Sequence, residues 1–183
     1  MNSPEETKSQ HIFSQDHIEQ ALLFLRRLPV FAETPLDILR LYAYLAQKEH
    51  YHKGDIILRH ATPCDRMFLI VSGQVAICHH RENKLFLFQE LKGEELNYFG
   101  ELSLVSKFNS PFCAVARSET VLYSLTREAF RRVMERYPER YISAVEKIVE
   151  LRIQRFVAQT NFLLDRLSEE ALEAITLTEA DFM

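Results

Sequence analysis

The feature that most constrains the fold is a series of short β-branched and aromatic runs between positions 47 and 126. These runs lie at 56–58, 67–71, 75–78, 85–88, 113–116 and 121–125. Turn-forming residues separate them, at 53–55, 62–63, 72–73 and 92–93. Several short strands with turns between them are typical of an all-β sandwich or barrel. All four glycines fall in this region, as frequent turns require.

Helical patterns precede the β region. Apolar residues recur at helical spacing over residues 15–28, and Pro29 ends that run. Thr34 and Pro35 predict the start of a second helix, because threonine is a good N-cap and proline is favoured at the first helical position. The sequence therefore predicts two helices before the first strand.

Helical patterns also follow the β region. A short helix is predicted over 127–136, and Pro138 separates it from an unbroken helix over 139–167. Ser168 is expected to cap a short final segment. The predicted division is a flexible lead-in at 1–14, the N-terminal helices with the β domain and short helix at 15–137, the long helix at 138–167 and a short acidic tail at 168–183.

The long helix carries an apolar stripe with the alternating spacing of a coiled coil. Its members are Val149, Ile153, Phe156, Thr160, Leu163 and Leu167. A helix over 139–167 would be about 43 Å long, which exceeds what a domain of this size can cover. We therefore predict a homodimer through this stripe; the alternative is that the stripe packs on the β domain.

Bulk properties exclude several classes of function. The net charge of −4 offers no basic face for a nucleic acid. No apolar run approaches the roughly 18–20 residues that cross a bilayer, and the first ten residues lack a secretory pattern. The sequence thus predicts a cytoplasmic protein with no membrane or nucleic-acid partner, whereas a protein partner stays open.

Metal binding and catalysis are not expected. Cys64, Cys78 and Cys113 are odd in number and form no metal-binding pair, so they are predicted to be buried, inert thiols. His79 and His80 are adjacent, and on a strand they would point to opposite faces. Because no nucleophile, phosphate-loop or metalloprotease motif occurs, the chain is predicted not to be an enzyme.

The segment 98–104 carries the candidate chemistry. Gly100 lets backbone amides turn toward a ligand, and successive amides can bind an anion. Glu101 can accept a hydrogen bond from a sugar hydroxyl, as acidic residues do in other nucleotide sites. A surface turn with a solvated glutamate is the alternative for this segment taken alone.

The order of motifs along the chain decides between these alternatives. Two helices are followed by Lys-Gly-Asp-Ile-Ile at 53–57, Asp-Arg-Met-Phe-Leu-Ile-Val-Ser-Gly-Gln-Val at 65–75, Phe-Gly-Glu-Leu at 99–102, two more strands and a long helix. This order resembles the cyclic nucleotide-binding domain family, over about residues 20–167. The resemblance implies an eight-stranded β-roll, jelly-roll-like in form, followed by a short helix and a long helix.

The resemblance also implies a ligand and its contacts. Cyclic AMP or cyclic GMP would bind in a phosphate-binding cassette that includes Phe99 and Ser103. The backbone at Gly100 and Leu102 would face the phosphate, and Glu101 would bond the ribose 2′-hydroxyl. The long helix would cover the ligand as a lid.

The chain departs from the family pattern nine residues after the glutamate. The family places an arginine there, followed by small residues, but this stretch is Ser110, Pro111, Phe112 and Cys113. Losing a charge-assisted bond to a buried phosphate costs roughly 2–5 kcal/mol. Nearby, Lys107 lacks the fork of a guanidinium. Ordinary cyclic-nucleotide binding is therefore predicted to be weak.

Two further departures point the same way. The turn before the cassette carries the acidic pair Glu94 and Glu95, and negative charge is unfavourable near an anion site. Phe156 and Val157 occupy lid positions where the family places polar base contacts.

Two hypotheses follow: a degenerate module that acts through dimerisation or protein contacts, and a sensor whose cassette still binds a cyclic nucleotide or another small anion. The family's helix-turn-helix domain is not expected, because residues 168–183 are few and carry no basic residue.

Overall fold

The computed structural model describes residues 15–81, 84–169 and 171. The predicted lead-in at 1–14 lies outside the described residues, as does most of the predicted tail. At the start of the tail, the Ser168 hydroxyl accepts a hydrogen bond from the backbone N–H of Ala171 at 3.2 Å. This is the capping contact predicted for Ser168.

The N-terminal part is helical, as predicted, but with shifted boundaries. It comprises α1 (Gln15–Leu25), the 3-10 helix η1 (Pro29–Phe31) and α2 (Leu36–Leu45). The prediction that Thr34 caps α2 is wrong. The N–H of Leu39 donates to the carbonyl of Pro35 at 2.9 Å, so Pro35 is the N-cap, and no side chain caps this helix.

The described residues then form ten strands: β1 (Gln47–Tyr51), β2 (Ile56–Leu58), β3 (Pro63–Cys64), β4 (Arg66–Ser72), β5 (Gln74–Arg81), β6 (Lys84–Lys92), β7 (Tyr98–Phe99), β8 (Phe108–Asn109), β9 (Cys113–Ala116) and β10 (Thr120–Thr126). They form two antiparallel four-stranded sheets, in the orders β1-β10-β4-β7 and β2-β9-β5-β6. The two sheets are the predicted eight-stranded β-roll. The additional pair, β3 with β8, links the two loops beside the cassette.

Two apolar clusters hold the fold together. The first joins the sheet residues Met67, Leu69 and Tyr123 to the helices at one end of the roll. The second fills the roll between the two sheets, with Ile70 and Phe99 among its members. The cassette strand β7 therefore packs into the interior of the roll from one sheet edge.

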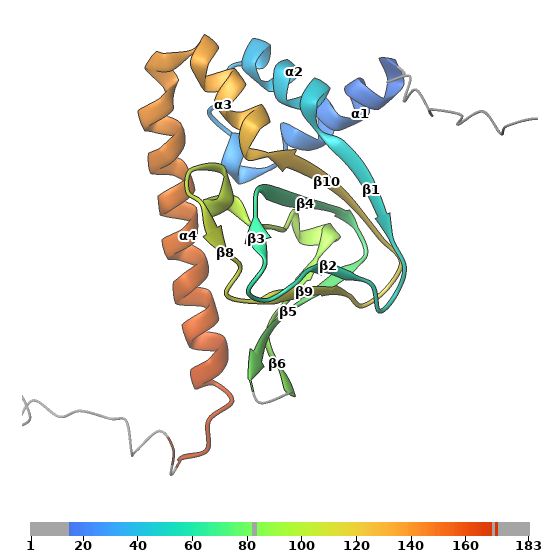
Figure 1. The fold of residues 1–183 in the computed structure, drawn as a ribbon, viewed down its shortest axis with the longest axis vertical. Helices are drawn as coiled ribbons and strands as arrows, with labels where there is room; N and C mark the ends of the chain where they lie inside the picture. Colours follow the sequence, from blue (N-terminus) through green and yellow to red (C-terminus); the bar gives the residue numbers. More distant parts are fainter. Residues whose placement is uncertain (1–14, 82–83, 170, 172–183) are drawn as a thin grey trace, which may run out of the picture.

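The C-terminal part contains α3 (Arg127–Arg136), the 3-10 helix η4 (Pro138–Arg140) and α4 (Tyr141–Leu164). The long helix is shorter than the predicted 139–167, because η4 precedes it and its last helical residue is Leu164. Its 24 residues span about 36 Å. This still reaches along the whole side of the roll, as Figure 1 shows.

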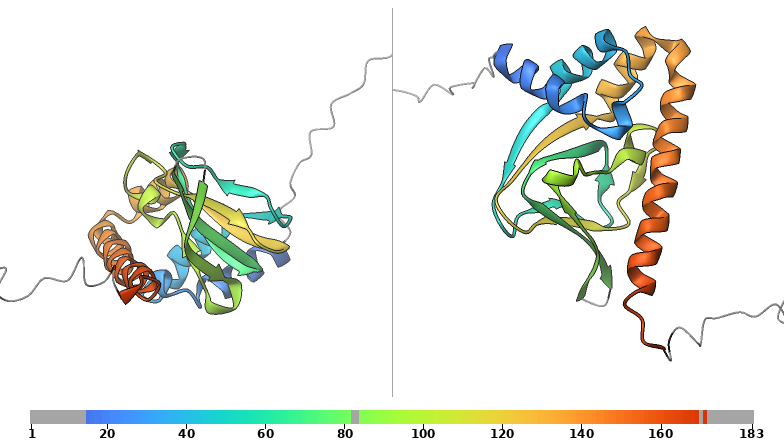
Figure 2. Two further views of the ribbon diagram at one scale, coloured as in Figure 1. Left: turned by 90° about the horizontal axis from the view of Figure 1, so that it is seen from below. Right: turned by 180° about the vertical axis from the view of Figure 1, so that it is seen from behind.

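The helices cover one end and one side of the roll. α1, α2 and α3 gather at the end of the roll where α4 begins (Figures 1 and 2). From there α4 contacts η1, the cassette segment η3 (Glu101–Leu104) and β6. The cassette thus lies beneath the long helix.

The cysteines behave as predicted, since Cys64, Cys78 and Cys113 are buried and free. Burial raises the pKa of the Cys78 thiol, and the Cys113 thiol donates to the Cys78 carbonyl at 3.3 Å. Among the described residues, no group of three or more potential ligand side chains could hold a metal ion. No helix in this same part of the chain is long and apolar enough to span a bilayer.

Candidate functional site

The cassette begins with a backbone turn that only glycine can make. Gly100 follows β7 with a φ of 78°, in the left-handed region. A Cβ at this position would lie 2.7 Å from the carbonyl oxygen of Arg66. Two hydrogen bonds then close the turn. The backbone N–H and the hydroxyl of Ser103 both donate to the Gly100 carbonyl, at 3.0 and 2.6 Å. The segment from Phe99 to Ser103 is therefore firmly positioned.

Glu101 is the most unusual side chain of the cassette. It is only 3% exposed, and its Oε1 has no hydrogen-bond partner among the described residues. An unpaired buried acceptor costs roughly 1–3 kcal/mol, more if it is charged. Glu101 therefore offers a buried acceptor atom to any group that can donate to it.

Arg127 holds the cassette to the rest of the domain. It lies at the first position of α3, and its guanidinium donates to the carbonyls of Ser103, Cys64 and Ser106, the last two at 2.7 Å. We did not identify this residue from the sequence. Its partners are backbone carbonyls distant in sequence, which leave no residue pattern to recognise.

Ser110 does not present a free group to an anion. It is 1% exposed, and its hydroxyl donates to the Phe112 carbonyl at 2.7 Å. Its backbone is paired as well, with Ala61 and Thr62 at 2.8 Å each. The position at which the resemblance predicts a phosphate-binding arginine is thus occupied by a side chain that bonds its own loop.

The three residues after Ser110 differ in their surroundings, and only the ring of Phe112 reaches the apolar interior of the roll. Phe112 is half-buried and packs against the apolar cluster inside the roll. Above its ring lies Arg152 of α4, with Cζ 5.9 Å from the ring centroid. Pro111 is exposed, and Cys113 is buried at the start of β9.

The lid helix is fastened to the roll by two polar residues. The guanidinium of Arg155 donates to the Tyr98 carbonyl, and its Cζ lies 4.5 Å from the centre of the Tyr98 ring. One turn further along, the Gln159 amide donates to the Gln89 side chain of β6 at 3.1 Å. Gln159 is buried, and its Oε1 has no partner among the described residues.

The predicted lid residues make none of these contacts within the single chain. Phe156 and Val157 do not face the roll in this structure, since their side chains are 62% and 51% exposed. The residues of α4 that do face the domain are spaced three to four apart: Ile148, Leu151, Arg155 and Gln159. The apolar stripe was the stronger signal in the sequence, and it lies on the other side of the helix.

That stripe is open to solvent. Val149, Ile153, Phe156 and Leu163 are exposed, and Thr160 is half-exposed with its hydroxyl bonded to the Phe156 carbonyl at 2.9 Å. The alternative that this face packs on the β domain is therefore excluded for the single chain. Three exposed apolar residues of β6 add to the unpartnered apolar surface: Leu85, Phe86 and Leu87.

Glu94, Glu95 and Lys107, the charged residues near the cassette in the sequence, make their recognised contacts elsewhere. Glu94 and Glu95 are exposed, and Glu95 accepts from the Asn97 amide at 2.9 Å. Lys107 lines a surface hollow together with Asp65 and the charged side chains of α3. Within the described part of the chain, neither the acidic turn nor Lys107 forms a hydrogen bond or ion pair with Glu101 or a cation–π contact with Phe112.

These elements define a class of protein: a β-roll with a glycine–glutamate cassette and a helix closing its side. The comparisons with known proteins name it. Residues 48–137 match the family described as the cyclic nucleotide-binding domain. Over residues 48–137, just under half of its length, the chain is therefore a cyclic nucleotide-binding domain, which is a regulatory module.

Relatives agree with the assignment. The chain is 27% identical to the mouse potassium/sodium hyperpolarization-activated cyclic nucleotide-gated channel 2 over 143 residues. This alignment covers 78% of the chain but only 16% of the channel. A cyclic nucleotide-binding domain from Methylobacillus flagellatus has a similar fold, with a TM-score of 0.69 at 18% identity over 84% of this chain and 85% of that one. The Thermus thermophilus catabolite activator protein gives a TM-score of 0.59 at 23% identity, over 75% of this chain and 62% of that one.

Proposed function

We propose that this chain is a non-enzymatic regulatory module whose output does not depend on cyclic AMP or cyclic GMP. The observation that carries the proposal is Ser110, which stands in place of the arginine and bonds the Phe112 carbonyl. A neutral hydroxyl cannot replace a bidentate guanidinium opposite a buried phosphate. Phe112, packed against the interior cluster, adds bulk at a position that is small in the family.

The attachment of α4 supports the same proposal. Arg155 and Gln159 hold the helix to Tyr98 and Gln89 through contacts made by the protein alone. Arg152, which lies over Phe112, adds a third contact near the cassette. In this proposal the closed position of α4 is the resting state, and the module acts through the exposed face of that helix.

Calorimetry with cyclic AMP and cyclic GMP tests the proposal. The chain as it stands is compared with the double variant Ser110→Arg with Phe112→Ala, which restores the family pattern. We expect the double variant to bind about thirty-fold to several thousand-fold more tightly, as a charge-assisted bond of roughly 2–5 kcal/mol predicts. Adding Glu101→Gln to the double variant should weaken that binding again. Tight binding by the unaltered chain would overturn the proposal.

The second candidate function is a sensor that binds a cyclic nucleotide or another small anion in the cassette. It is favoured by Glu101, whose buried Oε1 has no partner and could accept from a ligand hydroxyl. The test is a thermal-shift screen of the unaltered chain with cyclic AMP, cyclic GMP and cyclic dinucleotides, repeated with Glu101→Gln. Stabilisation that this substitution removes would establish the sensor, and no shift at millimolar ligand would reject it.

We further propose that the output is a homodimer through the exposed stripe of α4. Ile153→Asp would bury a charge in such an interface, so we expect it to convert a dimer to a monomer. Gln154→Asp is the matched control, since Gln154 is an exposed neighbour on the same helix. Light scattering gives the mass in solution. A monomeric unaltered chain at tens of micromolar would contradict the prediction.

A further inference from the structure

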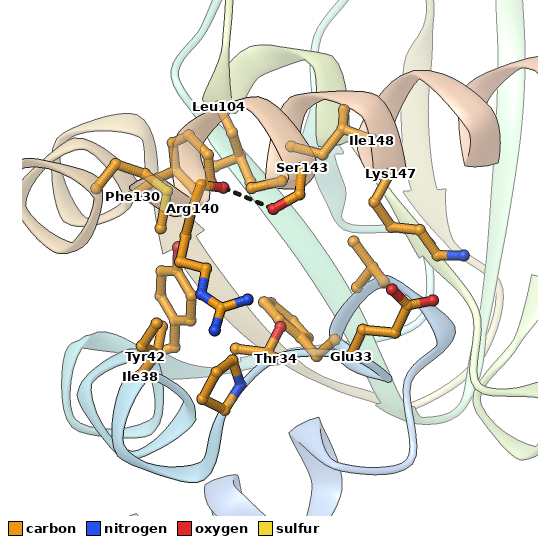
Figure 3. Close-up of a pocket in the computed structure, with 15 residues that line it drawn as sticks. Glu33, Thr34, Ile38, Tyr42, Leu104, Phe130, Arg140, Ser143, Lys147 and Ile148 are labelled. Carbon is orange, nitrogen blue, oxygen red and sulfur yellow. Dashed lines mark hydrogen bonds between the residues drawn. The ribbon is translucent and has the colours of Figure 1, made fainter. Parts of the chain in front are cut away.

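A cavity lies outside the roll, where the helices meet. It has a volume of about 140 Å³ and is lined by η1, the loop at 33–35, α2, α3, η4 and the first turns of α4, with Leu104 contributed by the cassette segment (Figure 3). A dry apolar cavity of about 150 Å³ can accept a benzene ring. The space is therefore of the size of one aromatic ring.

The wall of this cavity suits an aromatic ligand. Three rings line it and pack on one another: Phe31 lies 5.4 Å from Tyr42, and Tyr42 lies 6.3 Å from Phe130, centroid to centroid. Aromatic rings associate at such separations with a gain beyond the area that they bury. Ile38, Met134 and Ile148 are among the other apolar residues of the lining.

Tyr42 also brings an unused polar group to the cavity. The residue is only 3% exposed, and its hydroxyl makes no hydrogen bond within the described residues. The hydroxyl oxygen is not itself a fully buried atom, so it opens onto the cavity that Tyr42 lines. Burial raises the pKa of Tyr42 well above its ordinary value, so the hydroxyl keeps its proton and can donate.

The rim of the cavity carries one available positive charge. Arg140 is exposed and makes no ion pair with any described residue, and Figure 3 shows its guanidinium pointing into the cavity between Tyr42 and Thr34. The other rim charges are Lys147 and Glu33. Lys147 bonds Glu150 at 3.0 Å and lies within the electrostatic reach of Glu33, so its charge is already balanced.

We propose that this cavity binds a monocyclic aromatic carboxylate, with the ring among Phe31, Tyr42 and Phe130 and the carboxylate accepting from Arg140 and the Tyr42 hydroxyl. A bound ligand would connect α2 and α3 to the start of α4, beside Leu104 at the end of the cassette segment. It would thus strengthen the attachment of the lid helix from a site separate from Glu101 and Ser110.

Calorimetry with three probes tests this site: benzoate, benzyl alcohol and acetate. Benzoate carries both the ring and the charge, whereas each of the others carries only one. We expect saturable benzoate binding that is about tenfold tighter than benzyl alcohol, because a charge-assisted bond is stronger than a neutral one, and no saturable acetate binding. No benzoate binding at millimolar concentration, or equal binding of acetate, would overturn the proposal.

Variants locate the binding. Arg140→Gln should remove the advantage of benzoate over benzyl alcohol, and Tyr42→Phe should weaken benzoate about threefold to tenfold. Ala144→Leu fills the cavity and should abolish binding of both probes. Arg117→Gln, an exposed arginine outside the cavity lining, is the control and should change nothing. Unchanged benzoate affinity in Arg140→Gln and Ala144→Leu, or displacement of benzoate by cyclic AMP, would place the probe elsewhere and reject the site.

Discussion

At the scale of single residues, Gly100 meets two requirements at once. Its positive φ excludes most side chains, and its close approach to the Arg66 carbonyl excludes a Cβ in any conformation. Both requirements arise because the cassette must turn sharply from β7 into η3 while it packs on β4. The glycine therefore serves the shape of the cassette whether or not a ligand binds there.

We predict that Gly100→Ala destabilises the protein by more than about 2 kcal/mol, because the strain of a positive φ adds to the contact with Arg66. Gly54→Ala is the matched control. Gly54 also has a positive φ, of 96°, but a Cβ there would meet nothing within 4 Å. It should lose about 1–2 kcal/mol, from backbone strain alone. Urea unfolding measures both variants, and equal losses would show that the close approach has no energetic effect.

At the scale of secondary-structure elements, the two faces of α4 differ in how they are held. The inward face combines the apolar Ile148 and Leu151 with the polar Arg155 and Gln159, whereas the apolar stripe through Ile153 points to solvent. Hydrophobic periodicity predicts a buried face from its apolar residues, so it selected the stripe. It cannot recognise a face that is held by hydrogen bonds to the roll.

The junction of α3 with the cassette makes a second element-scale prediction. Arg127→Met removes three hydrogen bonds to carbonyls, two of 2.7 Å, and leaves those acceptors without this donor. We expect a loss of about 2–3 kcal/mol and a melting temperature lower by roughly 4–12 °C. Arg131→Met is the control, because Arg131 is exposed on the same helix and makes only a surface ion pair with Glu135 at 3.7 Å. It should change the melting temperature by no more than roughly 2–4 °C.

At the scale of the whole molecule, buried tyrosines couple folding to pH. Burial raises the pKa of Tyr42, Tyr51, Tyr98 and Tyr123 above the ordinary value of 10.0, and at Tyr98 it outweighs the opposing charge of Arg155. The folded protein thus holds these phenolic protons more tightly than the unfolded chain does. Their contribution to stability is complete below pH 10 and is lost as the pH rises toward the folded-state values.

We therefore expect the free energy of unfolding to fall steeply above about pH 10. Tyr123→Phe removes one of the titrating groups and should make that fall less steep, with little change at neutral pH. Denaturant unfolding at a series of pH values measures both. An unchanged alkaline slope in the variant would rule out a contribution from Tyr123.

The residues themselves predicted the order of elements and an all-β core, whereas the β-roll and the place of the cassette followed from the resemblance of the motif order to a known family. Short apolar runs between turns and the pattern around Gly100 and Glu101 are local features, and local geometry fixes their meaning. The departure at Ser110 from the pattern that the resemblance implies is equally visible in the sequence, because the motif sets its register, and it stays a prediction.

Only the tertiary structure decided what these residues contact. The bond from Ser110 to Phe112, the arginines that hold the cassette and the lid, and the cavity around Tyr42 all join segments distant along the chain. Backbone carbonyls provide many of the partners, and every residue type has one. Such contacts are therefore determined by how the elements pack, and no spacing in the sequence records them.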